Sequence, residues 1–306
     1  MMSRRGAAFE FASGFAVRYL RRERLLTLRA HYFSARKRLY PLMRAAYGSF
    51  DVTALREHLE QRLTDDFEIL MVHSSVNNMK PMYTDGPLEL VRMLISFCGP
   101  TRTLAMPAFY FGDPAIGGAF ATLKQQPRFD LRRTPSQMGL ATELFRRSKG
   151  VLQSRHPVYR MSALGPFAEQ LTYGHELAAS SVGPGTPFDF MAKHDTLIIG
   201  IGKPFEVLTQ VHHAEEVMGD SFPVPRACGD SLNITLVDGE EVIPFHIEQR
   251  HIQGRLNVWK LRTIMPSDKL RQWKFHNIPI FATRAADVTG ALIAAARTGV
   301  TLYEES

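Results

Sequence analysis

Short apolar runs that alternate with amphipathic stretches constrain the fold of this chain more than any other feature of its sequence. Three runs have the length and composition of buried strands: residues 68–73, 102–107 and 195–201. The stretches at 51–60 and 87–97 have helical periodicity, and Asp51 or Thr53 is placed to cap the first of them. Apolar strands that alternate with helices are typical of an α/β fold, in which layers of helices cover a central sheet.

Polar residues at a strand end indicate a site in such a fold, because ligands gather at the carboxyl ends of the strands. Residues 73–75, His-Ser-Ser, directly follow the first predicted strand. Farther along, residues 229–250 contain two strand-like segments joined at Asp238 and Gly239, which predicts a β-hairpin. We interpret this hairpin as an insertion in the second half of the chain and as a flap beside the site.

The positive charge of the chain is concentrated at its N-terminal end. Residues 1–50 contain 11 Lys and Arg against two Glu, a charge of +9, whereas the whole chain carries only +7. Residues 51–306 therefore carry −2. Because this larger part is slightly acidic, we expect no nucleic-acid binding by it. The sequence predicts two parts, a basic extension over residues 1–50 and a catalytic domain over residues 51–306.

Apolar residues recur at roughly helical spacing among the arginines of the extension: Leu25, Leu28, Tyr32, Leu39 and Leu42. This pattern predicts one or two amphipathic basic helices. Such helices bind anionic lipid, so one interpretation attaches residues 1–45 to a membrane surface. The other is a docking or oligomerisation arm, and a homodimer stays open. Since no apolar run reaches the length of a spanning helix, we predict a cytoplasmic protein, peripheral to the inner face of the membrane if the extension binds lipid.

Several site chemistries are disfavoured by motifs that the sequence lacks. Cys98 and Cys228 are its only cysteines, and their spacing is not that of metal ligands. Residues 212–216, His-His-Ala-Glu-Glu, lack the HExxH pattern and an obvious third ligand, so we predict no metal site. Ser74 has no flanking glycines of a nucleophile elbow, which disfavours a hydrolase.

Two segments contain candidate acid–base residues. His156 precedes Pro157, where the backbone favours extended geometry and can fix a side chain. His212 and Glu215 are three residues apart, so on a helix they share a face, and the carboxylate would orient the imidazole. A structural histidine or a surface pair explains each of these equally well. The residues alone thus indicate an α/β enzyme without defining its reaction.

A series of short motifs, taken in order, resembles the aminoglycoside 3-N-acetyltransferase (antibiotic N-acetyltransferase) family. The motifs lie at residues 71–75, 106–107, 129–139, 144–146, 154–157, 163–166, 185–188, 197–202 and 209–215. The resemblance extends from about Asp51 to the C-terminus. It implies an α/β fold with a central mixed sheet, acetyl-CoA as donor and the amine of an amino sugar as acceptor.

The resemblance also implies catalytic roles. An amine must lose a proton to attack a thioester, and imidazole is the side chain best suited to accept it near neutral pH. His156 matches the family motif Ser-x-His-Pro, Glu215 matches the Glu of His-Leu-Ala-Glu, and His212 would line the same pocket. The resemblance gives the role of base to His156. Because His213 stands where the family usually has Leu, the division of labour between His156 and His212 stays open.

The expected contacts of acetyl-CoA follow the same motifs: Ser74, Ser75, Thr134, Ser136, Met138, Gly139 and Ser154. Backbone N–H groups around residues 74–75 or 138–139 are candidate donors to the thioester oxyanion. Arg132, Arg133 or Arg155 would be available to the phosphates of the cofactor. We expect direct acetyl transfer without an acyl-enzyme.

The acceptor is less constrained than the donor. An enzyme that inactivates polycationic drugs should have a clearly acidic face, whereas residues 51–306 carry only −2. We therefore expect an amino sugar of glycan, polysaccharide or natural-product biosynthesis. The alternatives are aminoglycoside acetylation that confers antibiotic resistance and a non-catalytic scaffold, against which the joint presence of His156, His212 and Glu215 argues.

Overall fold

The computed structural model describes residues 38–64 and 66–304 and divides the chain between Ser49 and Phe50. In the first part, helix α3 (Tyr40–Tyr47) buries none of its residues. The amphipathic helices and the membrane attachment predicted for residues 1–45 fall mainly outside the described residues and stay predictions. No helix within the described ranges combines the length and the hydropathy that crossing a membrane requires.

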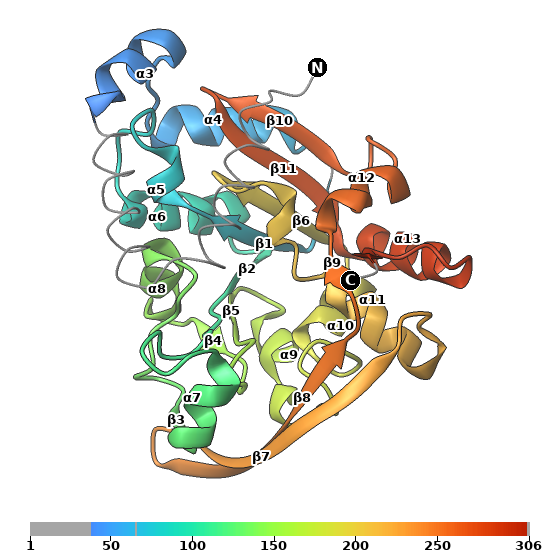
Figure 1. The fold of residues 1–306 in the computed structure, drawn as a ribbon. Coiled ribbons are helices and arrows are strands. Elements are labelled where there is room, and N and C mark those ends of the chain that lie inside the picture. The colour runs from blue at the N-terminus through green and yellow to red at the C-terminus, as the bar shows by residue number, and fades with distance from the viewer. Residues whose placement is uncertain (1–37, 65, 305–306) are drawn as a thin grey trace. The chain divides into compact units, whose positions relative to one another are not determined.

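A seven-stranded mixed sheet is the centre of residues 50–304, in the order β10-β11-β6-β1-β2-β5-β4 (Figure 1). Its strands are β1 (Ile69–Ser74), β2 (Thr103–Pro107), β4 (Leu152–Gln153), β5 (Met161–Leu164), β6 (Thr196–Ile201), β10 (Arg271–Phe275) and β11 (Ile278–Arg284). β1 pairs in parallel with β2 and β6, whereas β5 and β11 run antiparallel to their neighbours β2 and β6. The predicted central mixed sheet is confirmed.

The three strands predicted from apolar runs are the three middle strands of this sheet. Every residue of β1, β2 and β6 is buried. Strands covered on both faces require apolar side chains in both directions, which explains why their sequences are continuous apolar runs. The edge strand β10 instead alternates half-buried and exposed residues.

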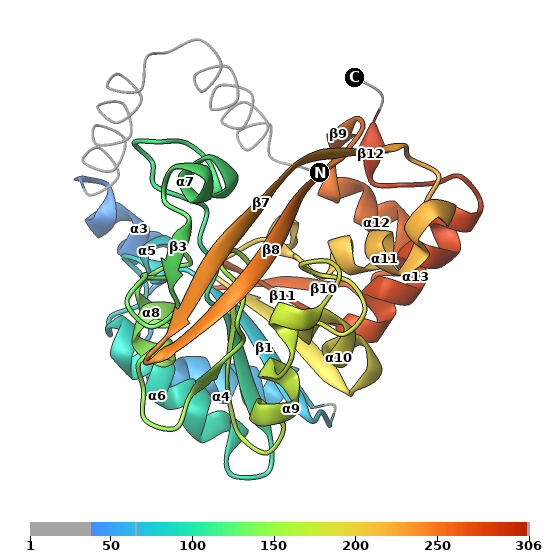
Figure 2. The same cartoon turned by 90° about the horizontal axis from the view of Figure 1, so that it is seen from below.

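Helices cover both faces of the sheet (Figure 2). They are α4 (Val52–Arg62), α5 (Val76–Met79), α6 (Pro87–Cys98), α7 (Ala119–Gln125), α8 (Leu140–Arg146), α9 (Ala168–Thr172), α10 (Pro187–Lys193), α11 (Val211–Met218), α12 (Leu261–Ile264) and α13 (Ala285–Arg297). Helices α4, α6 and α8 pack in one group, and α9, α10, α11 and α13 in another. The predicted cap of α4 is confirmed, because the Asp51 carboxylate accepts the backbone N–H of Ala54 at 2.9 Å.

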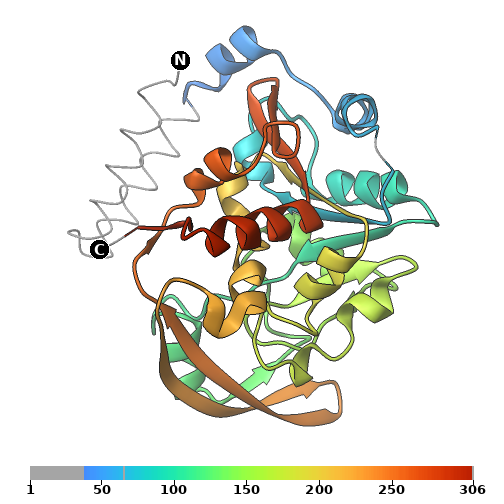
Figure 3. The same cartoon turned by 90° about the vertical axis from the view of Figure 1, so that its right-hand side faces the viewer.

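The predicted hairpin is also confirmed, with longer strands than expected. β7 (Arg226–Asp238) and β8 (Glu241–Ile252) pair antiparallel, and β3 (Arg128–Asp130) adds to β7 in parallel. Figure 3 shows the hairpin as a long curved ribbon. A separate apolar cluster lies beneath it, formed by Leu123, Phe129, Leu131, Ile234, Leu236, Phe245 and Ile247. The hairpin is therefore fixed to the rest of the fold by its own small core.

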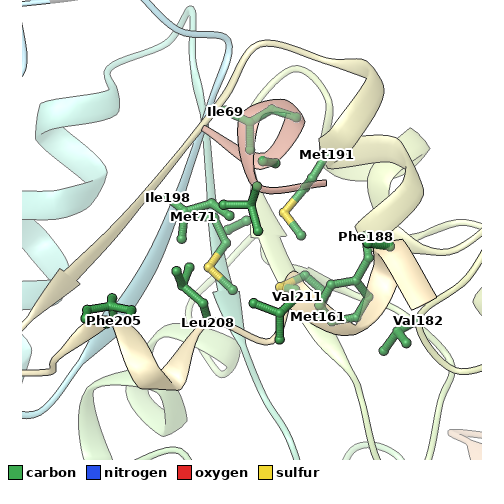
Figure 4. Close-up of a cluster of buried hydrophobic side chains, with 14 of the residues drawn as sticks. Ile69, Met71, Met161, Val182, Phe188, Met191, Ile198, Phe205, Leu208 and Val211 are labelled. Atoms are coloured by element: carbon green, nitrogen blue, oxygen red, sulfur yellow. The ribbon is translucent and has the colours of Figure 1, made fainter. Parts of the chain in front are cut away.

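The main core joins the middle of the sheet to the helices that follow β5 and β6 (Figure 4). Met71 of β1 and Ile198 of β6 contribute from the sheet, whereas Met191 of α10 and Val211 of α11 contribute from the helices. All four are at most 1% exposed. Because α11 begins with a core residue, its position relative to the sheet is set by packing.

The C-terminal part returns to this core through a short second sheet. β9 (Arg255–Leu256) pairs antiparallel with β12 (Tyr303–Glu304). Leu302, directly before β12, is 3% exposed and belongs to the main core. The described residues also contain single helical turns at His175–Leu177, Phe205–Val207, Gly219–Ser221 and Val258–Lys260.

Two glycines provide a matched test of this packing. A Cβ at Gly200 in β6 would lie 2.0 Å from the ring of Phe281, whereas a Cβ at the exposed Gly290 in α13 meets no atom within 4 Å. We expect Gly200→Ala to lower the free energy of unfolding by about 1–3 kcal/mol through overpacking. Gly290→Ala should raise it by up to about 1 kcal/mol, because alanine favours the helix. Urea unfolding checks both, and equal effects of the two variants would contradict the expected packing of β6 against β11.

Candidate active site

A cavity of about 440 Å³ lies between helix α11, strand β8 of the hairpin and residues 178–182. The three predicted acid–base residues, His156, His212 and Glu215, all line it. Tyr303 of β12 lines it as well. The structure thus brings together side chains that are far apart in the sequence.

Helix α11 places His212 beside Glu215. The Nδ1 atom of His212 lies 3.2 Å from Oε2 of Glu215, and the Glu215 side chain is 6% exposed while that of His212 is 31% exposed. A carboxylate oxygen only accepts hydrogen bonds, so Nδ1 carries the proton in this pair. In a neutral imidazole, Nε2 is then unprotonated. The pair therefore has the arrangement of a general base and the carboxylate that orients it.

The second oxygen of the Glu215 carboxylate is also engaged. The Tyr303 hydroxyl donates to Oε1 at 3.0 Å. Burial raises the pKa of Tyr303, and the neighbouring Glu215 carboxylate raises it further, so the hydroxyl stays protonated and remains a donor. Arg226 donates to the backbone carbonyl of Glu215 and lies 3.5 Å from the Glu216 carboxylate.

His156 has a different arrangement from His212. Its Nδ1 atom accepts the backbone N–H groups of Val158 and Tyr159 at 3.0 and 2.9 Å. The ring stacks on His175 with a centroid distance of 4.6 Å and is 2% exposed. Burial lowers its pKa well below 6.5, and His175 and Arg160 lower it further. His156 is therefore neutral with its proton on Nε2, an arrangement suited to donating a hydrogen bond.

His213, the departure from the family pattern, faces away from the cavity. Its Nδ1 donates to the Val182 carbonyl at 2.7 Å, and its Nε2 lies 3.7 Å from the Asp189 carboxylate. The ring is 1% exposed and burial lowers its pKa. This histidine ties the wall at residues 178–182 to α11 and is not among the residues that line the cavity.

None of the predicted cofactor contacts is among the residues that line the cavity. Ser154 is fully buried; its hydroxyl donates to Nδ1 of His175 and accepts the Met161 N–H, both at 2.9 Å. Its role in the structure is to position His175, which stacks on His156. Ser74 is 7% exposed, and its hydroxyl bonds to no residue that the structure describes. Ser75 caps α5.

Residues 134–139 form a fixed turn before α8. The Ser136 hydroxyl accepts the Met138 N–H at 3.1 Å, and Arg160 donates to the Thr134 carbonyl at 3.0 Å. Gly139 precedes α8 with a φ of 107°, a conformation that favours glycine. The Met138 side chain packs against the main core. None of these residues lines the cavity that contains His212.

Two of the three candidate phosphate ligands are paired with carboxylates of the hairpin turn. Arg132 lies 2.7 Å from Asp238, and Arg155 lies 3.1 Å from Asp238 and 2.6 Å from Glu241. Burial acts to lower the pKa of Arg155, but these carboxylates outweigh it and raise the pKa above its ordinary value. A phosphate would have to compete with these carboxylates for both guanidinium groups, and phosphate binding by Arg132 and Arg155 stays a prediction. Arg133 is 91% exposed and lies 3.8 Å from Asp130.

Sequence reasoning missed two residues of this site. Tyr303 is 88 residues from its partner Glu215, and Arg226 reaches the same helix from the start of the hairpin. Neither contact belongs to a local motif, and Tyr303 reaches α11 from β12, which pairs with β9. Within the described part of the chain, no group of three His, Cys, Asp or Glu is placed to hold a metal ion.

Comparison with known proteins gives one family. The model of the family described as aminoglycoside 3-N-acetyltransferase matches residues 71–295. An aminoglycoside N(3)-acetyltransferase III from Salmonella sp is 30% identical over 172 residues, which cover 54% of this chain and 59% of the relative. The aligned region thus spans less than two thirds of that relative.

Solved structures share the fold. The structure of AAC-IIIb in binary complex with CoASH superposes with a TM-score of 0.67 at 22% identity, covering 83% of this chain and 99% of the other. AAC-VIa bound to sisomicin gives a TM-score of 0.64 at 22% identity, covering 80% and 97%. These similarities show the α/β architecture.

Buried neutral histidines predict that the protein loses stability in acid. Burial lowers the pKa of His73 to about 3 and that of His175 to about 4, from 6.5. Below pH 6.5 the unfolded chain therefore binds protons that the folded chain does not, and the free energy of unfolding falls by up to about 1.4 kcal/mol per pH unit for each imidazole. This loss ends near the folded pKa. Above about pH 6.5 these residues contribute no slope.

Urea unfolding as a function of pH measures this slope. Between about pH 6 and pH 5, His175→Asn should reduce the slope of the free energy of unfolding against pH by the amount that corresponds to about one bound proton. Gly290→Ala, which removes no titrating group, should change the free energy of unfolding but not its slope. A free energy of unfolding that does not fall over this range would contradict the burial of neutral imidazoles.

Proposed function

The chain belongs to the aminoglycoside 3-N-acetyltransferase family, and we propose that it transfers the acetyl group of acetyl-CoA to an amine of an aminoglycoside. The observation that carries the proposal is the His212–Glu215 pair at the cavity wall, with Nδ1 3.2 Å from Oε2. Acetyl transfer to an amine needs a base that faces the acceptor, and this pair supplies one.

His212 is the general base of the proposed reaction. The acceptor enters this step as a neutral amine, its ammonium form having lost a proton to solvent, and Nε2 removes one further proton from the nitrogen as it attacks the thioester carbonyl carbon. Glu215 keeps the other ring proton on Nδ1 and stabilises the imidazolium that forms. When the tetrahedral intermediate collapses, the C–S bond breaks and the imidazolium returns its proton to the leaving thiolate. The products are the N-acetylated amine and CoA thiol.

His156 acts as a hydrogen-bond donor in the same reaction. Two backbone N–H groups occupy its Nδ1, so its Nε2–H is the group that can reach a ligand in the cavity. A neutral imidazole that donates to a developing oxyanion stabilises it without giving up its proton, and one such donor is worth roughly 3 kcal/mol in comparable sites. The open choice between the two histidines thus becomes a division of roles.

Acetyl-CoA is the proposed donor, supported by the CoASH complex of AAC-IIIb, which shares this fold. The contacts predicted at residues 74–75 and 134–139 remain predictions. Ser74 offers a buried hydroxyl at the carboxyl end of β1, which no described residue satisfies. Ser154 is instead a positioning residue, because it orients His175 beneath His156.

An aminoglycoside is the proposed acceptor for two reasons. The curated relative is named for aminoglycosides and AAC-VIa is solved with sisomicin, whereas nothing in the comparisons supports a glycan precursor. The described residues that line the cavity also include three carboxylates, Glu215, Glu216 and Glu248, and the guanidinium of Arg226. A local excess of carboxylates attracts a polycation even where the net charge of residues 51–306 is small. A homodimer and the membrane attachment of residues 1–45 stay predictions.

Release of CoA thiol from acetyl-CoA tests the proposed reaction. With a panel of aminoglycosides, the wild type should release thiol, and His212→Asn should lower kcat by roughly 10²–10⁴ because the base is lost. His194→Asn, a histidine outside the cavity lining, should leave kcat unchanged. Turnover of none of the aminoglycosides, or full activity of His212→Asn, would refute the proposal.

The carboxylates that line the cavity predict how a substitution among them changes the affinity for the acceptor. Glu248→Gln should raise KM for a polycationic aminoglycoside about two- to fivefold, the effect expected of one exposed carboxylate. Because salt screens exposed charges, the increase should shrink as ionic strength rises. Glu240→Gln in the hairpin turn, outside the cavity lining, is the matched control. An equal effect of both variants would show that the wall does not select the acceptor.

A further inference from the structure

Tyr303 contacts Glu215, the carboxylate partner of the proposed general base His212, from a part of the chain outside the matched family region. The match ends at residue 295. The Tyr303 hydroxyl donates to Oε1 of Glu215 at 3.0 Å, while Oε2 of the same carboxylate faces Nδ1 of His212 at 3.2 Å. The carboxylate thus lies between two donors, one on each oxygen.

The position of Tyr303 is fixed by its surroundings. It pairs with Leu256 across the β9–β12 sheet, and its backbone carbonyl accepts Nζ of Lys260 at 3.1 Å. Its ring packs edge-on against Phe222, with centroids 6.1 Å apart. Leu302, the preceding residue, is buried in the main core. The hydroxyl is therefore presented to Glu215 from a rigid support.

The Glu215 carboxylate needs this support for a physical reason. A glutamate side chain has three rotatable torsions, and here it is 6% exposed, so water cannot replace a missing donor at little cost. A fixed donor on Oε1 restricts the terminal torsion of the carboxylate. Oε2 is then directed at His212.

We propose that Tyr303 is a positioning residue for the reaction described above, holding the Glu215 carboxylate in the orientation that keeps the His212 proton on Nδ1. The inference rests on the proposed function, since it assigns Tyr303 a part in activating His212. Tyr303 also lines the cavity, so a direct contact with the acceptor is the competing role that an experiment has to separate.

Tyr303→Phe removes the hydroxyl and keeps the ring. If Tyr303 acts through Glu215, kcat should fall roughly tenfold while KM for the aminoglycoside changes less than twofold, because a hydrogen bond to a charged group is lost. Tyr173→Phe, at an exposed position, is the matched control. A rise in KM at unchanged kcat would overturn the proposal in favour of an acceptor contact, and wild-type kinetics would overturn it outright.

A double-mutant cycle sharpens the assignment. In a Glu215→Ala background the tyrosine hydroxyl has no carboxylate to hold, so Tyr303→Phe should no longer lower kcat. An undiminished tenfold loss in that background would overturn the proposal. Unfolding curves of each variant establish that it is folded under the assay conditions.

A spectroscopic measurement separates this inference from the proposed function. In ¹⁵N-labelled protein without substrate, the His212 ring, assigned by its absence in His212→Asn, should show the Nδ1–H tautomer. Tyr303→Phe should shift it toward a mixture with the Nε2–H tautomer. If Tyr303→Phe leaves the His212 tautomer unchanged, the role of Tyr303 is overturned. If the tautomer shifts but the wild type releases no thiol, the proposed reaction is refuted and the positioning role of Tyr303 stands.

Discussion

The parallel pairing of β1 with β6 is the interaction on which the rest of this structure depends. It joins Ile69–Ser74 to Thr196–Ile201, so more than a hundred residues must cross from one strand to the other. β2, β5, α9 and α10 lie within that connection. α11 follows β6 and begins with Val211 in the core formed on these strands. The position of His212 relative to the sheet is thus a consequence of strand pairing.

Buried polar groups determine which nitrogen of each histidine in the site carries a proton. His175 donates from Nε2 to the Ser181 carbonyl at 2.9 Å and accepts the Ser154 hydroxyl on Nδ1, so its tautomer is fixed. His156 stacks on it, and burial, together with the neighbouring His175, lowers the pKa of His156. His212, at the more exposed wall, is the histidine paired with a carboxylate. His156 and His212 are the same residue type, and their burial and hydrogen-bond partners are what distinguish the proposed donor, His156, from the proposed base, His212.

The parts of the fold that the sequence predicted are those with local signals. β1, β2, β6, α6 and the hairpin each correspond to an apolar run, a helical period or an Asp-Gly turn, and the structure confirms them. Charge was less informative, because a sum over residues 51–306 does not show that Glu215, Glu216 and Glu248 share one cavity. Likewise, the pairing of Arg132 and Arg155 with Asp238 depends on the docked hairpin turn. Long-range contacts of this kind leave no periodic signal.

Glu215 is the point at which such contacts converge. Its carboxylate meets His212 from its own helix and Tyr303 from β12, and its backbone carbonyl accepts Arg226 from β7. Helix formation alone brings His212 and Glu215 together, since residues three apart share a face. The other two partners come from outside the helix: Arg226 is 11 residues and Tyr303 is 88 residues from Glu215 along the chain, so these contacts carry the larger cost in loop closure. The pair itself is thus local to α11, whereas the contacts that fix its orientation come from β7 and β12.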